Sequence, residues 1–151
     1  MTERDADGDG WIEGATHYLP LRVQYEDTDL SGAVYHANYL KFMERGRSDY
    51  VRLIAIDQTA LAAGPEGVFF VVRHCAIAFL KPARLDDRLQ VRTRFTGDSG
   101  ARLNCTQSVW RGTENLARAD ITLACVGKDG RPKRLPAILR QAVADLLTDA
   151  E

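Results

Sequence analysis

The sequence is poor in cysteine and contains no paired cysteine motif. Its three cysteines, Cys75, Cys105 and Cys125, are widely spaced in 151 residues and form no Cys-x-x-Cys pair. An odd number of isolated cysteines argues against a disulfide framework and against a zinc site. We therefore expect a chain that works in a reducing compartment, the cytoplasm, and that binds no metal.

Long apolar stretches and an excess of one charge are also missing. The longest stretch without Asp, Glu, Lys or Arg runs only from Leu30 to Leu40, whereas a membrane-spanning helix needs about 18 apolar residues. The 20 basic and 21 acidic side chains leave a formal net charge of -1, so the basic excess of a nucleic-acid-binding protein is absent. The N-terminus is acidic and lacks an apolar core, so we expect no secretory signal. We expect no transmembrane segment and no nucleic acid partner.

The length of the chain allows one domain and little else. Residues 1–14 mix Asp and Gly without a hydrophobic period, which is typical of a mobile terminal segment. We predict a mobile acidic N-terminal arm over residues 1–16 and a single folded domain over residues 17–148.

Hydrophobic periodicity predicts one long helix among several strands. Alternating apolar residues predict a strand over residues 18–26, and an apolar stripe of helical spacing predicts a helix over residues 37–55. Gly46 lies on that stripe, which indicates a close backbone approach to the packing partner, while Asp49 falls on another face. Further strands are predicted over residues 68–81, where the strand is bent or bulged, and over 88–96, 102–110 and 116–126, followed by a helix over 136–147. One long helix packed on a curved antiparallel sheet of about five strands is an α+β fold.

The densest cluster of reactive side chains falls between the first predicted strand and the long helix. A loop carboxylate such as Asp29 can attack a carbonyl or activate water. The unpaired N–H groups of a helix that starts near His36 can stabilise a developing oxyanion. Together these groups suit acyl transfer. The alternative is that Asp27 and Asp29 form an ordinary polar turn and that His36 merely caps the helix.

The same segment resembles a family signature. The pattern reads Tyr25-x-Asp27-Thr28-Asp29-x-x-Gly32-x-Val34-Tyr35-His36-x-Asn38-Tyr39. It closely resembles the signature of hotdog-fold acyl-CoA thioesterases of the 4-hydroxybenzoyl-CoA thioesterase type, and most closely the Tol-Pal-associated branch. The resemblance continues through residues 70–73, 82–87 and 133–136, so it covers about residues 18–140.

This resemblance implies a hotdog fold that assembles as a homodimer or homotetramer, with active sites at the subunit interface. It implies that Asp29 is the catalytic carboxylate, acting as nucleophile or as general base. The helix start at His36 would polarise the thioester carbonyl, with help from the His36 side chain, and Tyr25 matches a third catalytic position. No cofactor is implied, because thioester hydrolysis needs only water, a base and an oxyanion hole.

Other matches to the family carry less information. Ser99, Gly100 and Arg102 align with a turn that contacts CoA in the 4-hydroxybenzoyl-CoA enzymes. The basic residues Arg131, Lys133 and Arg134 are an alternative anion patch or an ordinary solvated surface. We interpret Asp27 as a residue that orients the loop, and His17 and His74 as structural. Phe42, Met43, Phe69 and Phe70 either line an acyl channel or only pack the core.

The sequence therefore predicts an acyl-CoA thioesterase that releases a carboxylic acid and free CoA. Two alternatives stay open. One is a hotdog hydratase or dehydratase acting on acyl thioesters. The other is a non-enzymatic module that binds acyl carrier protein or an envelope complex.

Overall fold

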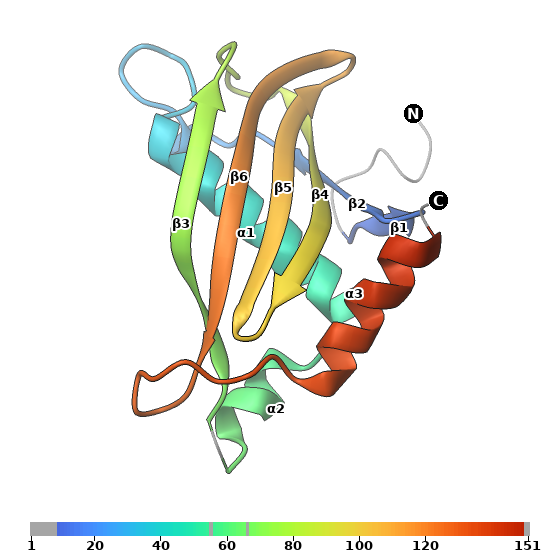
Figure 1. Ribbon diagram of the computed structural model, residues 1–151. Coiled ribbons are helices and arrows are strands. Elements are labelled where there is room, and N and C mark those ends of the chain that lie inside the picture. The colour runs from blue at the N-terminus through green and yellow to red at the C-terminus, as the bar shows by residue number, and fades with distance from the viewer. Residues whose placement is uncertain (1–8, 55, 66, 150–151) are drawn as a thin grey trace.

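A computed structural model describes residues 9–54, 56–65 and 67–149 (Figure 1). The long helix α1, His36–Leu53, lies across one face of a six-stranded antiparallel sheet. The order of the strands in the sheet is β1-β2-β4-β5-β6-β3. Their bounds are β1 Trp11–Glu13, β2 Thr16–Arg22, β3 Phe69–Phe79, β4 Arg88–Ser99, β5 Arg102–Arg111 and β6 Glu114–Val126. Two shorter helices complete the fold, α2 Gln58–Ala63 and α3 Ala137–Asp149.

This arrangement is the α+β hotdog architecture that the sequence predicts, with six strands where about five were expected. Figure 1 shows α1 crossing the sheet with its first turn near the end of β3. Among the described residues, no helix is both long enough and apolar enough to cross a membrane. All three cysteines are free.

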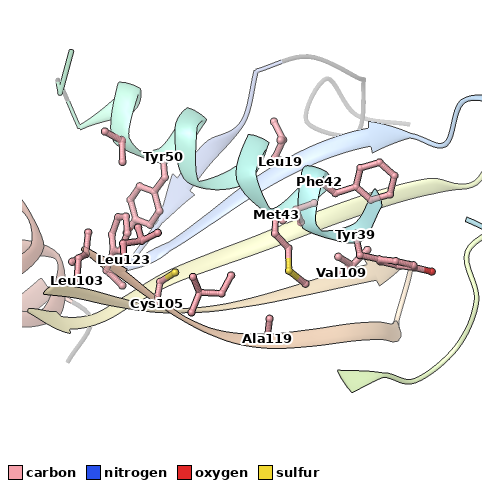
Figure 2. Packing of buried hydrophobic residues seen from close by; sticks show 14 of the residues in the cluster. Leu19, Tyr39, Phe42, Met43, Tyr50, Leu103, Cys105, Val109, Ala119 and Leu123 are labelled. Atoms are coloured by element: carbon pink, nitrogen blue, oxygen red, sulfur yellow. The ribbon is translucent and has the colours of Figure 1, made fainter. Parts of the chain in front are cut away.

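The core forms between α1 and the sheet. Tyr39, Phe42, Met43 and Tyr50 are buried on the apolar stripe of α1, and Figure 2 shows Tyr50 and Met43 extending toward the strands. A Cβ atom added at Gly46 would come within 2.9 Å of the Thr93 hydroxyl oxygen, which confirms the close approach that the sequence indicates. The position of α1 on the sheet, and with it the position of its first turn, is therefore fixed by packing.

The N-terminal segment differs from the predicted arm. Residues 1–8 lie outside the described residues, but Trp11–Glu13 form β1, which pairs with Thr16–Tyr18 of β2. Gly14 makes the connecting turn at a φ of 61°, a conformation that glycine adopts without steric cost. A strand of three residues is too short for a hydrophobic period to reveal it.

The first predicted strand is also shorter than expected. β2 ends at Arg22, and Tyr25–Asp27 form a 3-10 turn instead of continuing the alternation to residue 26. The Asp27 carboxylate accepts a hydrogen bond of 2.8 Å from the backbone N–H of Gln24. This local side-chain hydrogen bond replaces the ladder that a strand would need.

Two further features of the fold concern β3, whose shape the sequence left open, and a short helix that the sequence did not predict. The predicted bend in β3 is confirmed, because the register against β6 shifts between Val72 and His74. The helix α2 was not predicted; its first turn is capped by the Asp57 side chain, which accepts from the N–H of Ala60. β3 pairs only with β6 among the described strands, so β3 is an edge of the sheet.

Candidate active site

A tight hairpin carries Asp29 between β2 and α1. The N–H of Asp29 donates to the carbonyl of Ala33 at 3.0 Å, and the N–H of Gly32 donates to the carbonyl of Asp29 at 3.0 Å. Thr28 and Val34 form an antiparallel bridge at the base. Gly32 has a φ of 85°, so the residue that ends this turn must tolerate a left-handed backbone.

Asp27 comes just before this hairpin in the chain and is buried. Its carbonyl accepts hydrogen bonds from the N–H of Tyr35 at 2.9 Å and from the side-chain amide of Asn38 at 2.8 Å. Its carboxylate is already engaged with Gln24. Asp27 thus ties the hairpin to the first turn of α1, in agreement with the orienting role assigned to it from the sequence.

The segment Pro82–Asp87, another block of the family resemblance, packs against the same hairpin. The N–H of Val34 donates to the carbonyl of Ala83 at 2.8 Å, and the N–H of Ala83 donates to the Tyr39 hydroxyl at 3.0 Å. Ala33 and Arg84 form an antiparallel bridge. Two blocks that are far apart in the sequence therefore hold one loop in place.

Asp29 itself is exposed at the tip of the hairpin. One carboxylate oxygen accepts hydrogen bonds from the hydroxyl of Ser31 at 2.5 Å and from its backbone N–H at 2.8 Å. These two bonds hold the pKa of Asp29 below its usual value, and the nearby His36 lowers the pKa further. Asp29 is therefore ionised at neutral pH, as a nucleophile or general base must be. Sequence reasoning missed Ser31, although an Asp-x-Ser spacing is a known signal for such a local turn.

The start of α1 faces solvent beside this carboxylate. Helix α1 begins at His36, and Tyr35 occupies the N-cap without a side-chain cap. The first N–H groups of an uncapped helix are available to an external acceptor. The exposed His36 ring lies 4.6 Å from the Tyr35 ring and 6.1 Å from the Phe79 ring of β3. The end of the edge strand β3 thus borders the helix start.

Tyr25 belongs to the same loop but does not join the cluster in one chain. Its side chain is 83% exposed, and its carbonyl accepts from the hydroxyl of Thr28 at 2.7 Å. Within the part of the chain that the structure describes, no hydrogen bond links the Tyr25 hydroxyl to Asp29 or His36. The hydroxyl of Tyr25 is therefore not part of the hydrogen-bonded loop that holds Asp29.

The expected CoA-binding turn lies at the other end of the sheet. Ser99 pairs with Arg102 across the turn, with Gly100 at a φ of 60°, and Arg102 lies opposite Ala124 of β6. Phe79, which borders His36, lies opposite Ala117. The seven-residue offset along β6 corresponds to about 23 Å in an extended strand. One chain does not bring Ser99, Gly100 and Arg102 to Asp29.

The alternative basic patch lies at that same far end. The N–H of Leu135 donates to the carbonyl of Gly100 at 3.1 Å, and the N–H of Lys133 donates to the carbonyl of Cys125 at 2.8 Å. The Lys133 ammonium is 3.8 Å from the Asp129 carboxylate. The two candidate anion sites of the sequence are therefore neighbours, on the same turn cluster.

The candidate acyl-channel residues divide into two groups. Phe42 and Met43 have no exposed surface and only pack the core. Phe70 lines a cavity of about 270 Å³ between α1 and the start of β3, whose floor includes Leu103 and Leu123. Phe69 is 41% exposed on the sheet edge.

The sequence places Asp49 on another face than the apolar stripe of the helix and does not predict that its side chain is buried. Asp49 is buried and contacts the fully buried His17, with 2.7 Å between the carboxylate and Nε2. Asp49 also accepts from Arg52 at 2.6 Å and from the N–H of Gly10 at 2.9 Å. Burial raises the pKa of Asp49, but the three hydrogen bonds outweigh it and leave this pKa below its usual value.

The same burial acts on His17. It lowers the pKa of the imidazole and outweighs the hydrogen bond to Asp49, which acts in the opposite direction. His17 is thus a buried neutral ring that joins β2 to α1, which agrees with its structural interpretation. His74 lies exposed on β3. Among the described residues, no cluster of metal-ligating side chains is present.

Comparison with known proteins places this geometry in a family. The family model of the Thioesterase superfamily matches residues 31–118 of this chain, a segment that includes the start of α1. The chain belongs to the thioesterase superfamily. It is 41% identical over 119 residues to the acyl-CoA thioester hydrolase YbgC of Escherichia coli O6:H1, covering 78% of this chain and 87% of that protein. Membership and this identity make the chain a thioester hydrolase.

Solved structures agree with the fold. A probable thioesterase from Bartonella henselae shares 44% identity and a TM-score of 0.78, covering 81% of this chain and all of the other. The 1,4-dihydroxy-2-naphthoyl-CoA thioesterase Slr0204 from Synechocystis shares 24% identity and a TM-score of 0.80, over 87% of this chain and 97% of the other. The second likeness supports the fold alone.

Proposed function

We propose that this thioesterase hydrolyses acyl-CoA to a carboxylic acid and free CoA, with Asp29 as the reacting carboxylate. The observation that carries the proposal is the pairing of two groups on one rigid loop. An exposed, ionised Asp29 lies at its tip, and the uncapped start of α1 lies at its end. The Escherichia coli relative is named an acyl-CoA thioester hydrolase, which supports CoA as the thiol part of the substrate.

The chemistry needs few parts. The thioester carbonyl oxygen accepts hydrogen bonds from the N–H groups of the first turn of α1. The dipole of this helix stabilises the negative charge that develops on the oxygen. The Asp29 carboxylate either attacks the carbonyl carbon, expelling the CoA thiolate and leaving an anhydride that water cleaves, or removes a proton from a water that attacks directly. In both routes one water is consumed; the CoA sulfur leaves as a thiolate and takes up a proton that this water releases, directly or through Asp29. In this proposal the His36 side chain donates a hydrogen bond to the carbonyl oxygen or to the leaving sulfur.

The edge strand β3 supports a homodimer. It is 11 residues long, pairs only with β6 among the described strands, and exposes Phe69, Val71, Val72 and Phe79. A long apolar edge is a template for pairing with another strand. We propose that two copies pair their β3 edges antiparallel about a two-fold axis, with a tetramer formed from two such dimers.

This pairing would complete the active site. Antiparallel β3 strands bring the start of one strand to the end of the other. The 99–102 turn lies at the start of β3, because Cys125 pairs with Phe70 and its N–H donates to the carbonyl of Ala101 at 2.7 Å. The turn of the partner subunit, with its Ser99, Gly100 and Arg102, would then approach the start of α1 and contact the nucleotide end of CoA.

Three remaining proposals concern the setting of the reaction. Three free cysteines support a reducing compartment, the cytoplasm. Acyl carrier protein presents the same thioester group and is the second donor to test. The Tol-Pal association implied by the resemblance would be a further role beside catalysis.

The test is release of free thiol from short, long and aromatic acyl-CoAs. Wild-type protein should release thiol from at least one class, and Asp29→Asn should lower the rate by a factor of about 10²–10⁴. Glu26→Gln is the matched control, because Glu26 is an exposed carboxylate in the same loop, and it should keep near-normal rates. An Asp29→Asn variant as active as wild type would overturn the assignment. Loss of a double bond from an enoyl-CoA without thiol release would favour the hydratase alternative.

A further inference from the structure

The sheet has a second face, turned away from α1, and both tryptophans of the chain lie on it. The side chains of Val91 and Val109 point inward and are fully buried. Successive side chains of a strand point to opposite faces, so Arg92 and Trp110 lie on the outer face. The chain contains only two tryptophans, and the other, Trp11, stacks on Tyr18 of the neighbouring strand.

These aromatic side chains hold one arginine between them. The rings of Trp11 and Tyr18 are 5.6 Å apart and nearly parallel. The guanidinium of Arg92 lies 5.5 Å from the Tyr18 ring and 4.2 Å from the Trp110 ring. Its Nε donates to the Gln90 side chain at 2.8 Å. Stacking occupies the flat faces of the guanidinium and fixes its orientation, so its remaining N–H groups are preorganised for an acceptor at the edge.

Two more arginines flank Arg92. Arg94 follows on the same face of β4, and Arg118 of β6 lies across Ser108 of β5 in the same cross-strand row. Arg92 and Arg94 are about 7 Å apart along the strand. Arg118 lies two strand spacings from Arg92, about 10 Å, with β5 between them. We refer to Arg92, Arg94 and Arg118 as the arginine platform.

The platform surrounds a depression and lacks matching carboxylates. A cavity of about 410 Å³ is lined by all three arginines and by the hydroxyl-bearing Thr106 and Ser108. Among the described residues, none of these three arginines forms an ion pair. Asp120 is the one carboxylate that lines the cavity among the described residues. The site therefore carries an excess of two positive charges beside hydroxyl donors.

We propose that the arginine platform binds a small phosphorylated molecule through its phosphate groups. A guanidinium matches phosphate with two parallel N–H donors, which favours phosphate over a point-like anion. Three guanidinium groups within reach of one depression suit adjoining phosphates, as in a diphosphate. The Thr106 and Ser108 hydroxyls supply further donors between the arginines.

Other occupants fit this surface less well. A second copy would set one positive platform against another. The rings stack on one another and on Arg92, so they do not project as membrane anchors do. The platform also lies across the sheet from α1, so it is separate from the proposed reaction site and does not depend on it.

The two tryptophans make the test direct. Pyrophosphate is titrated into the full-length protein while intrinsic tryptophan fluorescence is followed, and calorimetry gives an independent binding curve. We expect saturable binding that changes the fluorescence, and weakening of that binding by added salt. Orthophosphate should bind more weakly, because it engages fewer arginines.

Variants assign the binding to the platform. Arg94→Gln and Arg118→Gln leave the aromatic stack intact, and each should weaken pyrophosphate binding roughly tenfold. Asp120→Asn should tighten binding, because it removes the opposing charge. Lys41→Gln, which removes an exposed charge on α1, is the matched control and should have no effect.

Three results would overturn the proposal. The first is the absence of saturable binding of pyrophosphate in either assay. The second is binding that Arg94→Gln and Arg118→Gln leave unchanged. The third is binding of polyglutamate or of anionic vesicles without binding of pyrophosphate, which would assign the platform to a macromolecule or a membrane.

Discussion

Two regions of this molecule each contain an aspartate and a histidine, and they are built in opposite ways. Asp29 and His36 lie exposed near each other and are not joined by a hydrogen bond, whereas Asp49 and His17 are buried, with 2.7 Å between the carboxylate and the imidazole. The buried pair has the closer geometry, yet α1, β2 and Gly10 surround it. His17 is 0% and Asp49 3% exposed, so this pair offers almost no surface to a substrate. Access, together with an uncapped helix start, therefore distinguishes the reactive pair from the structural one.

The largest effect on folding should come from the buried pair. Asp49→Asn leaves His17 and Arg52 without their carboxylate, and leaving buried hydrogen-bonding groups without a good partner destabilises a fold by about 1–3 kcal/mol. Denaturant unfolding should show this loss, with thiol release per folded molecule unchanged. Glu44→Gln, an exposed carboxylate on the same helix, should have little effect. An unchanged unfolding midpoint for Asp49→Asn would contradict the structural assignment.

The exposed region should depend on a second copy, whereas the buried one should not. The double variant Phe69→Lys and Val71→Lys places two charges on the apolar edge of β3. These charges should disfavour the pairing of two β3 strands. Size-exclusion chromatography should then show monomers, and thiol release should fall about tenfold or more, because the site would lose its partner. Tryptophan fluorescence of the outer sheet face should stay native. A fully active monomer would refute the interface site.

The buried pair should also set the acid sensitivity of the fold. The pKa of His17 is lowered by burial, so the unfolded chain takes up a proton first and stability falls as pH drops below about 6.5. The pKa of Asp49 is lowered as well, which adds a loss of stability at more acidic pH. His17→Gln should flatten the first part of the curve of unfolding free energy against pH. An equally steep curve for His17→Gln would assign the titration to another group.

The smallest expected effect concerns the exposed carboxylate. Ser31→Ala removes the hydroxyl that holds the pKa of Asp29 below its usual value, while the backbone N–H still donates. The pKa of Asp29 should therefore rise, and the acid limb of the rate profile should move to higher pH. Thiol release measured across acidic pH gives this shift. Thr28→Ser, which keeps a hydroxyl in the same loop, should leave the limb in place.

The sequence predicted the features that arise from neighbouring residues. The apolar stripe from Tyr39 to Tyr50 predicted α1 within two residues at each end, because helical periodicity is a local signal. Gly46 was correctly identified as a close approach. The family signature also marked the loop that carries Asp29 and His36.

The features that the sequence did not predict depend on distant residues. The burial of Asp49 was not predicted, because its partner His17 lies 32 residues away in the sequence. The alternation beyond Arg22 suggested a longer strand, but the Asp27 carboxylate turned the backbone at Gln24. The edge position of β3 follows from the strand order, which no local pattern encodes.

The most direct measurement is thiol release from one acyl-CoA by Asp29→Asn and by Asp49→Asn, at a temperature where circular dichroism shows both folded. The account predicts that Asp29→Asn loses activity by a factor of about 10²–10⁴, while Asp49→Asn keeps activity near that of wild type. If Asp49→Asn lost activity while Asp29→Asn kept it, the buried pair would be the catalytic one and the account would be wrong.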